Sequence, residues 1–324
     1  MLLINMHDAL PVSNIWESHC GQEFLKRKTV TQVVNIPLGL NSFASYGRID
    51  SILNALSDHP EEREVAIFVS DVSVTPIHYL HALKASVSNR DIKLFGYLRE
   101  EIGSNLRERA DIAFDTMLPE IFDKLFVATE WHKYILERIG WPKESIYVVG
   151  HPLAERADAL PVIPETVACI DIEEGLLFML AVATRYAELH DDKVEFIFDP
   201  SPSAKYIETI IKGTELALEN EESAVSVSIQ PVALKNCAIM LTARSFNSFN
   251  YRLAKGVVNG SHPIAPLSGC YLEMFNRDRY TYRRNDVDDC VEKIHEALKL
   301  PSPPMSYLDF SAASKIAEHI VDSF

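Results

Sequence analysis

The sequence predicts an α/β protein with two doubly wound domains, each built on a parallel sheet. Its 324 residues exceed what one hydrophobic core usually serves, which favours two domains of roughly 150 residues each. Short apolar runs alternate with amphipathic stretches, the pattern of βα units that feed a parallel sheet. The alternation stops in HPLAERADALPVIPE (151–165), which contains three prolines, and then starts again. We therefore expect the linker between the domains in this segment.

In the first half, apolar runs predict the strands and amphipathic stretches between them predict the helices. VAIFVS and KLFVAT are apolar on both faces, as buried parallel strands are. The predicted strands are Leu2–Asn5, Thr31–Pro37, Val65–Ser70, Ile92–Leu98, Lys124–Thr129 and Ser145–Gly150. The predicted helices are Ile15–Arg27, Arg48–Leu56, Ile77–Val87 and Glu130–Ile139. Thr129 is a good N-cap for the last of these helices, and Gly140 is a good C-cap.

The second half repeats the alternation and ends in two helices. Its predicted strands are VACIDI (167–172), KVEFIFD (193–199), AVSVSIQ (224–230), AIMLTA (238–243) and HPIAPL (262–267). Its predicted helices are Glu174–His190, Ala204–Asn220, Phe249–Asn259, Asp286–Leu300 and Tyr307–Ser323. We therefore expect an N-terminal domain over residues 1–155, a C-terminal domain over 156–305 and a final helix over 306–324.

The composition favours a compact, cytoplasmic protein that does not enter a membrane. The N-terminus has no basic flank, long apolar core or small-residue cleavage site, so it does not predict a secretion signal. No run approaches the roughly 20 apolar residues that span a bilayer. The formal net charge of −15 argues against a protein that attracts nucleic acid through its overall electrostatic field. A local basic groove can still exist on a protein with this net charge. An acidic balance also suits an enzyme that acts on small molecules.

Familiar cofactor and metal signatures are missing from the sequence. It contains no GxxxxGK[ST], GxGxxG, HExxH or GxSxG motif, which argues against the corresponding nucleotide, metalloprotease and hydrolase chemistry. The cysteines form no CxxC pair and have no histidine partner at metal spacing. They are Cys20, Cys169, Cys237, Cys270 and Cys290. We expect buried free thiols, no metal and no cofactor.

Two longer segments resemble glycosyltransferases of the GT-B class. FDKLFVATEWHKYILERIGWPKESIYVVGHPL (122–153) is similar to the unit that closes the N-terminal domain in that class. AIMLTARSFNSFNYRLAKGVVNGSHPIAPLSGCYLEMF (238–275) looks like the donor-site unit. The resemblance implies two Rossmann-like domains with a cleft between them and a C-terminal helix that crosses back to the N-terminal domain. It also implies transfer from a nucleotide-sugar donor to a hydroxyl-bearing acceptor, with the donor on the C-terminal domain.

The donor-site unit enters a helix near Phe249. A helix N-terminus suits a diphosphate, because its backbone N–H groups and its dipole attract anions. Arg252 is the strongest candidate, since a guanidinium binds phosphate oxygens in a fork. The alternative is a capping loop with one solvated arginine. The candidate donor-binding residues are Arg244, Asn247, Ser248, Asn250, Arg252 and Lys255.

Within the class, the asparagine-rich loop and its arginine-bearing helix resemble phage DNA glucosyltransferases, which implies hydroxymethylated DNA as an acceptor. That family has a glutamate three residues after the arginine, where this sequence has Lys255. Many GT-B enzymes also place Gly, Arg and Lys after the first strand of the C-terminal domain, where this chain has Asp171, Glu173 and Glu174. Each carboxylate near a pyrophosphate repels it by an amount on the order of 1 kcal/mol. These departures support two alternatives: transfer of a non-sugar group onto modified phage DNA bases, and a non-catalytic binding or scaffold protein.

Polar residues that follow strands are the candidates for acceptor binding and catalysis, because open α/β sheets bind ligands at the carboxyl ends of strands. An inverting transferase needs a base for the attacking hydroxyl, and the candidates are His7, Asp8 and Asp71. The candidate acceptor-binding residues are Arg99, Glu100 and His151. Each has a structural alternative: His7 and Asp8 form an ordered loop, Asp71 caps a turn, Arg99 pairs with a neighbouring carboxylate, and His151 is hydrogen-bonded within the fold.

Overall fold

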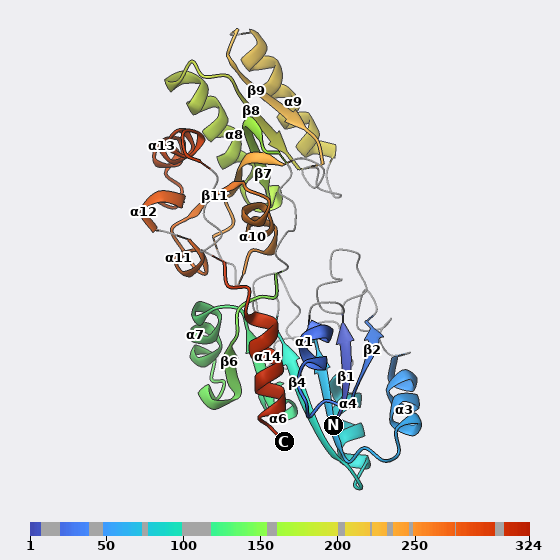
Figure 1. The fold of residues 1–324 in the computed structure, drawn as a ribbon. Helices are drawn as coiled ribbons and strands as arrows, with labels where there is room; N and C mark the ends of the chain where they lie inside the picture. Colours follow the sequence, from blue (N-terminus) through green and yellow to red (C-terminus); the bar gives the residue numbers. More distant parts are fainter. Residues whose placement is uncertain are drawn as a thin grey trace. The chain divides into compact units, whose positions relative to one another are not determined.

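The computed structural model of the chain forms two compact units, shown in Figure 1. The first unit is Met1–Ala154 together with Asp309–Phe324, and the second is Glu155–Leu308. Each unit is built on one six-stranded parallel sheet. The structure describes residues 1–7, 20–38, 48–72, 77–98, 118–153, 161–199, 205–220, 222–231, 236–245, 249–275, 277–301 and 308–324.

The first sheet has the strand order β2-β1-β3-β4-β5-β6. Its strands are β1 (Leu2–His7), β2 (Gln32–Pro37), β3 (Glu64–Val69), β4 (Asp91–Tyr97), β5 (Lys124–Val127) and β6 (Ile146–Val148). β1 is buried over its whole length, as expected for a central strand with helices on both faces. The chain order reverses between β1 and β3, so the carboxyl ends of these two strands mark the position where such sheets bind ligands.

Apart from the last one, α14, the described helices of the first unit lie between consecutive strands. They are α1 (Gly21–Leu25), α3 (Ile49–Asp58), α4 (Ile77–Ser86), α6 (Leu118–Ile121), α7 (Glu130–Arg138), the short 3₁₀ helix η5 (Lys143–Ser145) and α14 (Ala312–Val321). The predicted caps of α7 are confirmed. The backbone N–H of His132 donates to Oγ1 of Thr129 at 3.1 Å, and Gly140 adopts a φ of 99°, which glycine tolerates at a helix end.

The last helix, α14, follows the second unit in sequence but belongs to the first. The guanidinium of Arg27 donates to the carbonyl oxygen of Ser314 at 3.1 Å and to its hydroxyl at 2.9 Å. The ammonium of Lys124 donates to the carbonyl of His319 at 2.8 Å, and Lys93 donates to the carbonyl of Ser323. These contacts attach α14 to elements of the first unit. The carbonyl of His319 lies in the last turn of α14, where carbonyls have no N–H partner within the helix. The predicted return of the final helix to the first domain is therefore confirmed.

The second sheet has the strand order β12-β11-β10-β7-β8-β9, again with parallel pairs. Its strands are β7 (Ile163–Ile170), β8 (Val194–Phe198), β9 (Val225–Ile229), β10 (Cys237–Thr242), β11 (His262–Pro266) and β12 (Thr281–Tyr282). The helices are α8 (Ile172–Leu189), α9 (Lys205–Asn220), α10 (Tyr251–Val258), α11 (Tyr271–Met274), α12 (Arg277–Tyr280) and α13 (Val287–Leu298). The chain runs outward from β7 to β9 and then restarts at β10. The switch point of this sheet therefore lies between β7 and β10.

The predicted strands of both halves are confirmed, with ends that differ by a few residues. The main difference is β7, which begins at Ile163, inside the predicted linker. The first three residues of β7, Ile163, Pro164 and Glu165, are exposed, and the proline among them is typical of a linker. The sequence did not predict β12, α11 and α12, because these elements are too short to show a hydrophobic period. The five cysteines are free and buried, as predicted. Among the residues that the structure describes, no helix is both long enough and apolar enough to cross a membrane.

Candidate functional site

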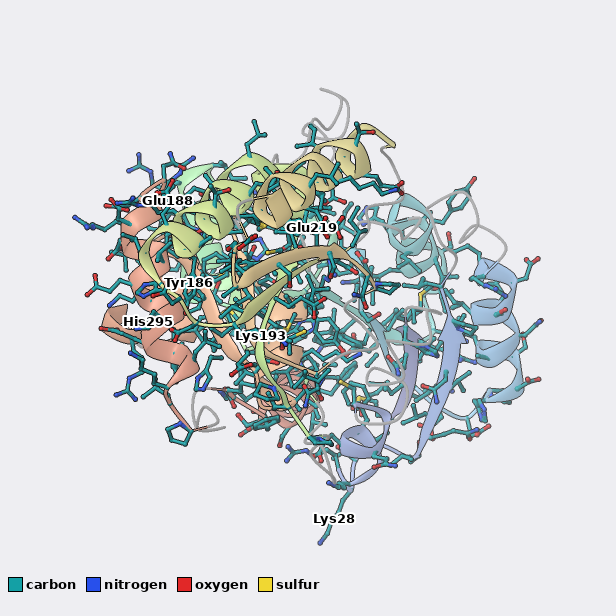
Figure 2. All side chains as sticks on the ribbon, turned by 90° about the horizontal axis from the view of Figure 1, so that it is seen from above. Lys28, Tyr186, Glu188, Lys193, Glu219 and His295 are labelled. Atoms are coloured by element: carbon teal, nitrogen blue, oxygen red, sulfur yellow. The ribbon has the colours of Figure 1, made fainter. Side chains whose placement is uncertain are left out.

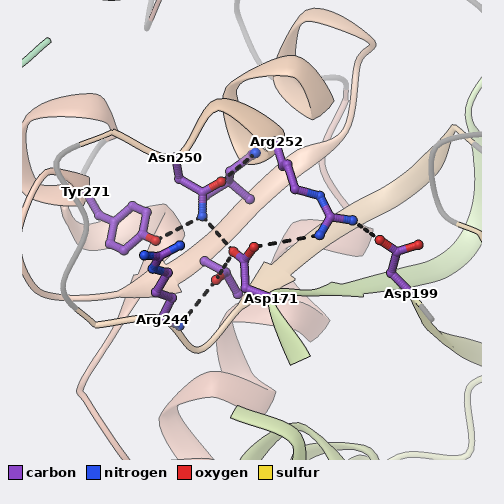
Figure 3. Close-up of polar contacts among 8 residues, drawn as sticks. Asp171, Asp199, Arg244, Asn250, Arg252 and Tyr271 are labelled. Carbon is purple, nitrogen blue, oxygen red and sulfur yellow. Dashed lines mark hydrogen bonds and ion pairs between the residues drawn. The ribbon is translucent and has the colours of Figure 1, made fainter. Parts of the chain in front are cut away.

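The candidate site lies at the carboxyl edge of the second sheet and centres on Asp171, the residue after β7. Its backbone is in the left-handed region (φ 56°, ψ 42°), which costs most L residues roughly 1 to 2 kcal/mol but is more accessible to Asp. Oδ2 of Asp171 accepts hydrogen bonds from the hydroxyl of Thr242 and the amide of Asn250, both at 2.9 Å. Figure 3 shows this arrangement. These bonds join the ends of β7 and β10 to the start of α10.

Asn250 is the N-cap of α10 and is almost fully buried. Its Oδ1 accepts from the backbone N–H of Leu253 at 3.0 Å, and its Nδ2 donates to the hydroxyl of Tyr271 at 3.1 Å as well as to Asp171. An Asn side chain has two donor hydrogens, so both are engaged inside the protein. We therefore assign Asn250 a positioning role: it holds Asp171 and the first turn of α10 in place.

Arg252 lies in the first turn of α10, between two carboxylates. One of its terminal nitrogens is 3.7 Å from Oδ1 of Asp171, and the other forms an ion pair with Asp199, the residue after β8 (Figure 3). The Arg252 side chain is 44% exposed, whereas those of Asp171 and Asp199 are 15% and 19% exposed. The three side chains carry a formal charge of −1 together. An anionic ligand must therefore compete with Asp171 and Asp199 for the guanidinium.

The remaining predicted donor residues surround this cluster to different degrees. The backbone N–H of Arg244 donates to the hydroxyl of Thr242 at 3.3 Å. The side chain of Arg244 is half-buried. Lys255 is exposed, one turn after Arg252 on α10. Asn247 and Ser248 lie outside the described residues. The structure thus brings Arg244, Asn250 and Arg252 to the same edge of the sheet.

A small cavity adjoins the end of β10 on the side of β11 and β12. Its volume is about 100 Å³ and its lining includes Gly175, Ala243, Ser245, Tyr282 and Arg284. Gly175 interrupts the helical geometry of α8, and a Cβ built on it would lie 2.3 Å from Cβ of Ala243. Only glycine therefore allows α8 to approach the end of β10 so closely. At about 100 Å³, the cavity is smaller than the roughly 300 Å³ at which ligand pockets begin.

Tyr282 supports the strand end beneath this cavity. Its hydroxyl donates to the carbonyl of Thr242 at 2.9 Å. Burial raises the pKa of the Tyr282 phenol well above its ordinary value, because the phenolate would lose its hydration. The hydroxyl therefore keeps its proton and remains a hydrogen-bond donor at physiological pH. The end of β10 is held by Tyr282 at the carbonyl of Thr242 and by Asp171 at the hydroxyl of Thr242.

In the first unit, two predicted catalytic residues lie at the switch point of the sheet. His7 ends β1 and is buried, and Asp71 follows β3 and is half-buried. The two strands are neighbours in register, with Met6 paired to Val69. In this register His7 lies beside Ser70, and Asp71 is one residue further along, so both residues lie at the same carboxyl edge of the sheet. Asp8 lies outside the described residues.

The predicted acceptor residue His151 is 6% exposed and contacts the end of β4. Its Nδ1 is 2.9 Å from the hydroxyl of Tyr97, which also donates to the carbonyl of Gly150 at 3.0 Å. The hydroxyl has only one hydrogen, which it donates to Gly150. In the contact with His151 the donor is therefore Nδ1–H of the imidazole, and the hydroxyl oxygen accepts. This arrangement matches the structural alternative for His151. Arg99 and Glu100 lie outside the described residues.

Three residues of the site were missed by sequence reasoning: Thr242, Asp199 and Tyr271. Asp199 ends KVEFIFD, and the rule that selected Asp71 would have selected it too. Thr242 ends a strand in the same way. Tyr271 carries no signal, because it reaches Asn250 from α11, a helix of a single turn.

The two sheets with their switch points define the GT-B fold of two Rossmann-like units, and comparison with solved structures supports this assignment. The predicted architecture is therefore confirmed. No model of a known protein family matches the sequence, and no curated protein matches it.

Individual solved structures are similar over 80% to 100% of this chain. Anabaena HepE in complex with UDP-glucose is 10% identical, has a TM-score of 0.63, and is matched over 100% of this chain and 99% of that chain. UDP-GlcNAc 2-epimerase from Methanocaldococcus jannaschii is 13% identical with a TM-score of 0.61, over 99% and 100% of the two chains. TarM of S. aureus, in a complex containing UDP, is 10% identical with a TM-score of 0.56; the match covers 80% of this chain and 51% of TarM.

Proposed function

We propose that the chain is a GT-B-type transferase that moves a sugar from a nucleotide-sugar donor to a hydroxyl group, with the donor bound by the second unit. The observation that carries this proposal is the position of Arg252. Its guanidinium lies in the first turn of α10, at the switch point between β7 and β10, where open α/β sheets bind ligands. The similarity of the fold to HepE, a protein solved with UDP-glucose, supports the same conclusion.

The donor diphosphate is expected to replace Asp199 as a partner of Arg252. A guanidinium has five N–H donors, and the exposed face of Arg252 leaves some of them accessible. A diphosphate carries more negative charge than one carboxylate, and it also attracts the N-terminus of α10. Asp171 remains beside the guanidinium and keeps it oriented.

The acceptor side is proposed for the first unit. His7 and Asp71 lie at its switch point and are the candidate bases for the attacking hydroxyl. Hydroxymethylated DNA is one acceptor to include, because the asparagine-rich loop resembles that of phage DNA glucosyltransferases. The buried free cysteines suit a reducing compartment such as the cytoplasm.

The test is intact-mass spectrometry of pooled hydroxyl acceptors, hydroxymethylated DNA among them, after incubation with pooled nucleotide sugars. Arg252→Ala should lower the yield about 100-fold, the order of effect seen when a charge-stabilising group is removed from an active site. The matched control is Arg185→Ala, since Arg185 is also half-exposed and paired with two carboxylates, Glu188 and Asp288. Equal activity of the Arg252→Ala variant and the original chain contradicts the proposed donor site.

A second candidate function is conversion of the nucleotide sugar itself, as the UDP-GlcNAc 2-epimerase with the same fold suggests. It predicts a nucleotide sugar of unchanged mass but altered stereochemistry, formed without acceptor and detected by NMR spectroscopy. A non-catalytic scaffold is the remaining possibility, since Arg252 is already paired with two carboxylates. In that case no nucleotide shifts the thermal unfolding, whereas a ligand at a hundred times its Kd stabilises the fold by about 2.7 kcal/mol.

A further inference from the structure

A cluster of two histidines and one aspartate lies at the opposite edge of the second sheet. His190 follows the C-terminus of α8, Asp192 lies in the turn before β8, and His295 is in the last turn of α13. One ligand atom from each of the three side chains lies within 4.8 Å of the others. Figure 2 labels His295 and the neighbouring Tyr186. The connection between α8 and β8 therefore supplies two of these metal-ligating groups, and α13 supplies the third.

The geometry of the cluster suits one small ion. Nδ1 of His295 is 3.1 Å from Oδ2 of Asp192. Two ligands on a tetrahedral Zn²⁺ are about 3.3 Å apart when each bond is about 2.0–2.1 Å long. The imidazole rings of His190 and His295 are stacked, with centroids 3.9 Å apart and planes inclined by 13°. Because the nitrogen lone pairs lie in the planes of the rings, ligation of one ion by both histidines requires the rings to turn out of this stack.

Tyr186 supplies the support that metal ligands commonly have. Its hydroxyl is 3.4 Å from Oδ2 of Asp192, to which it donates, and 3.2 Å from Nδ1 of His295. Its ring packs against both His190 and Phe196. A hydrogen bond of this kind orients the ligating carboxylate of Asp192. The contact with Nδ1 of His295 would give way to the ion, because that nitrogen is the proposed ligand atom.

We propose that His190, Asp192 and His295 form a binding site for a divalent first-row transition ion, with Zn²⁺ as the representative ion. Two imidazole nitrogens and one carboxylate oxygen are ligands that Zn²⁺ accepts, and they leave a fourth position for water. A hard ion such as Mg²⁺ prefers a shell made of oxygen atoms. The donor set therefore discriminates between the two classes of ion.

Lys299 competes with the ion in the metal-free chain. Its Nζ is 2.6 Å from Nε2 of His295, so Nε2 accepts the hydrogen bond and Nδ1 carries the proton that faces Asp192. Ligation through Nδ1 requires the other tautomer, in which Nε2 carries a proton and repels the ammonium group. Lys299 is exposed at the end of α13 and is free to move away. Removing its side chain should therefore strengthen metal binding.

The site has a structural role in this proposal. The cluster lies before the N-terminus of β8, whereas the Asp171 cluster lies beyond the carboxyl ends of β7 and β10. A bound ion would connect the end of α8 to the end of α13, two helices that pack on each other. Metal binding is therefore independent of the proposed transferase activity.

The test uses the full chain without an affinity tag, stripped by a chelator and titrated with ZnCl₂ by isothermal calorimetry. We expect one ion per chain and a loss of affinity of about 100-fold in His295→Ala and in Asp192→Asn, because each removes one of three protein ligands. Lys299→Ala should bind several-fold more tightly. The control His59→Ala removes a histidine of the first unit that pairs with Glu61 and should leave the titration unchanged.

Cobalt spectroscopy provides a readout on the unaltered chain. Co²⁺ should produce the visible d–d absorption bands of an ion with nitrogen and oxygen ligands. The near-ultraviolet charge-transfer band of a thiolate ligand should be missing, since the five cysteines are buried. The proposal is wrong if the His190→Ala/His295→Ala double variant, shown to be folded by circular dichroism, retains the original stoichiometry and affinity. A thiolate band, or no binding at all, overturns it as well.

Discussion

At the scale of single residues, the candidate donor site is a balance between one guanidinium and two carboxylates. Asp171 is held by Thr242 and Asn250 in a left-handed conformation, while Asp199 has a direct ion pair with Arg252. A half-exposed pair of this kind contributes at most about 1 kcal/mol, because water screens the charges. A ligand with two phosphates can therefore displace Asp199 at small cost.

This balance predicts the effect of Asp199→Asn. The substitution removes the charge that competes for Arg252 and keeps the size of the side chain, so UDP should bind about fivefold more tightly, equivalent to about 1 kcal/mol. Calorimetric titration with UDP measures the change. Glu188→Gln is the matched control, because it removes a partner of Arg185 instead. Weaker binding of UDP to the Asp199→Asn variant contradicts the competition.

A second residue-scale prediction concerns His132, a buried histidine on α7. Neither ring nitrogen has a partner among the residues that the structure describes. Burial lowers the pKa of His132 from 6.5 to about 4, because the imidazolium would lose its hydration. The unfolded chain takes up a proton near pH 6.5, and the folded chain does so only near pH 4. The contribution of neutral His132 to the free energy of unfolding is therefore fully present above pH 6.5. It is lost as the pH drops toward 4, by up to about 1.4 kcal/mol per pH unit.

His132→Phe should remove this sensitivity to acid. It replaces the ring with an apolar ring of similar size, so the free energy of unfolding at pH 7.5 should stay the same or rise. Between pH 7.5 and pH 5 the original chain should lose about 2 kcal/mol more than the variant. Urea unfolding at the two pH values measures this difference, and identical pH profiles would refute the assignment.

At the scale of elements, close packing of helices on the second sheet depends on glycine at particular positions. A Cβ on Gly175 of α8 would lie 2.3 Å from Cβ and 3.5 Å from Cα of Ala243. Ala243 has no flexible side chain that could move aside, so the helix or the strand must shift. In contrast, nothing lies within 4 Å of a Cβ on Gly213, which is exposed on α9.

These two glycines form a matched pair for substitution. Gly175→Ala should destabilise the second unit by roughly 1–3 kcal/mol, as overpacking does. Gly213→Ala should stabilise it by roughly 0.5–1 kcal/mol, because alanine is the better helix former. Chemical denaturation of both variants measures the changes, and a destabilisation of equal size in both would refute the packing argument.

At the scale of the whole molecule, the chain completes its first unit last. α14 begins at Ala312 yet packs on elements that precede Ala154. Its attachment uses Arg27, Lys93 and Lys124, whose side chains donate to backbone carbonyls of Ser314, Ser323 and His319. The first unit therefore cannot reach its final stability until the second unit has been synthesised.

This arrangement predicts the result of ending the chain at Leu308. The first unit should lose stability and exchange its amide hydrogens faster over β4 and β5, whereas β7, β8 and β10 of the second unit should keep their protection. Hydrogen exchange measured by mass spectrometry resolves the two units. Arg27→Ala should produce a milder form of the same effect, with Lys28→Ala as the neighbouring control. Equal loss of protection in both units contradicts the assignment of α14.

Local patterns in the sequence determined the alternation of strands and helices, the N-cap at Thr129, the burial of the cysteines and the placement of Arg252 at a helix start. These features depend on neighbours along the chain, where backbone geometry and hydrophobic period act. Only the tertiary structure decided the partners of that arginine. Asp199 reaches Arg252 because β8 pairs with β7 on one side and β10 pairs with β7 on the other, and strand order is a property of the whole sheet. In the same way, only the packing of α13 on α8 brings His295 from a distant part of the chain to His190 and Asp192, which are close in sequence.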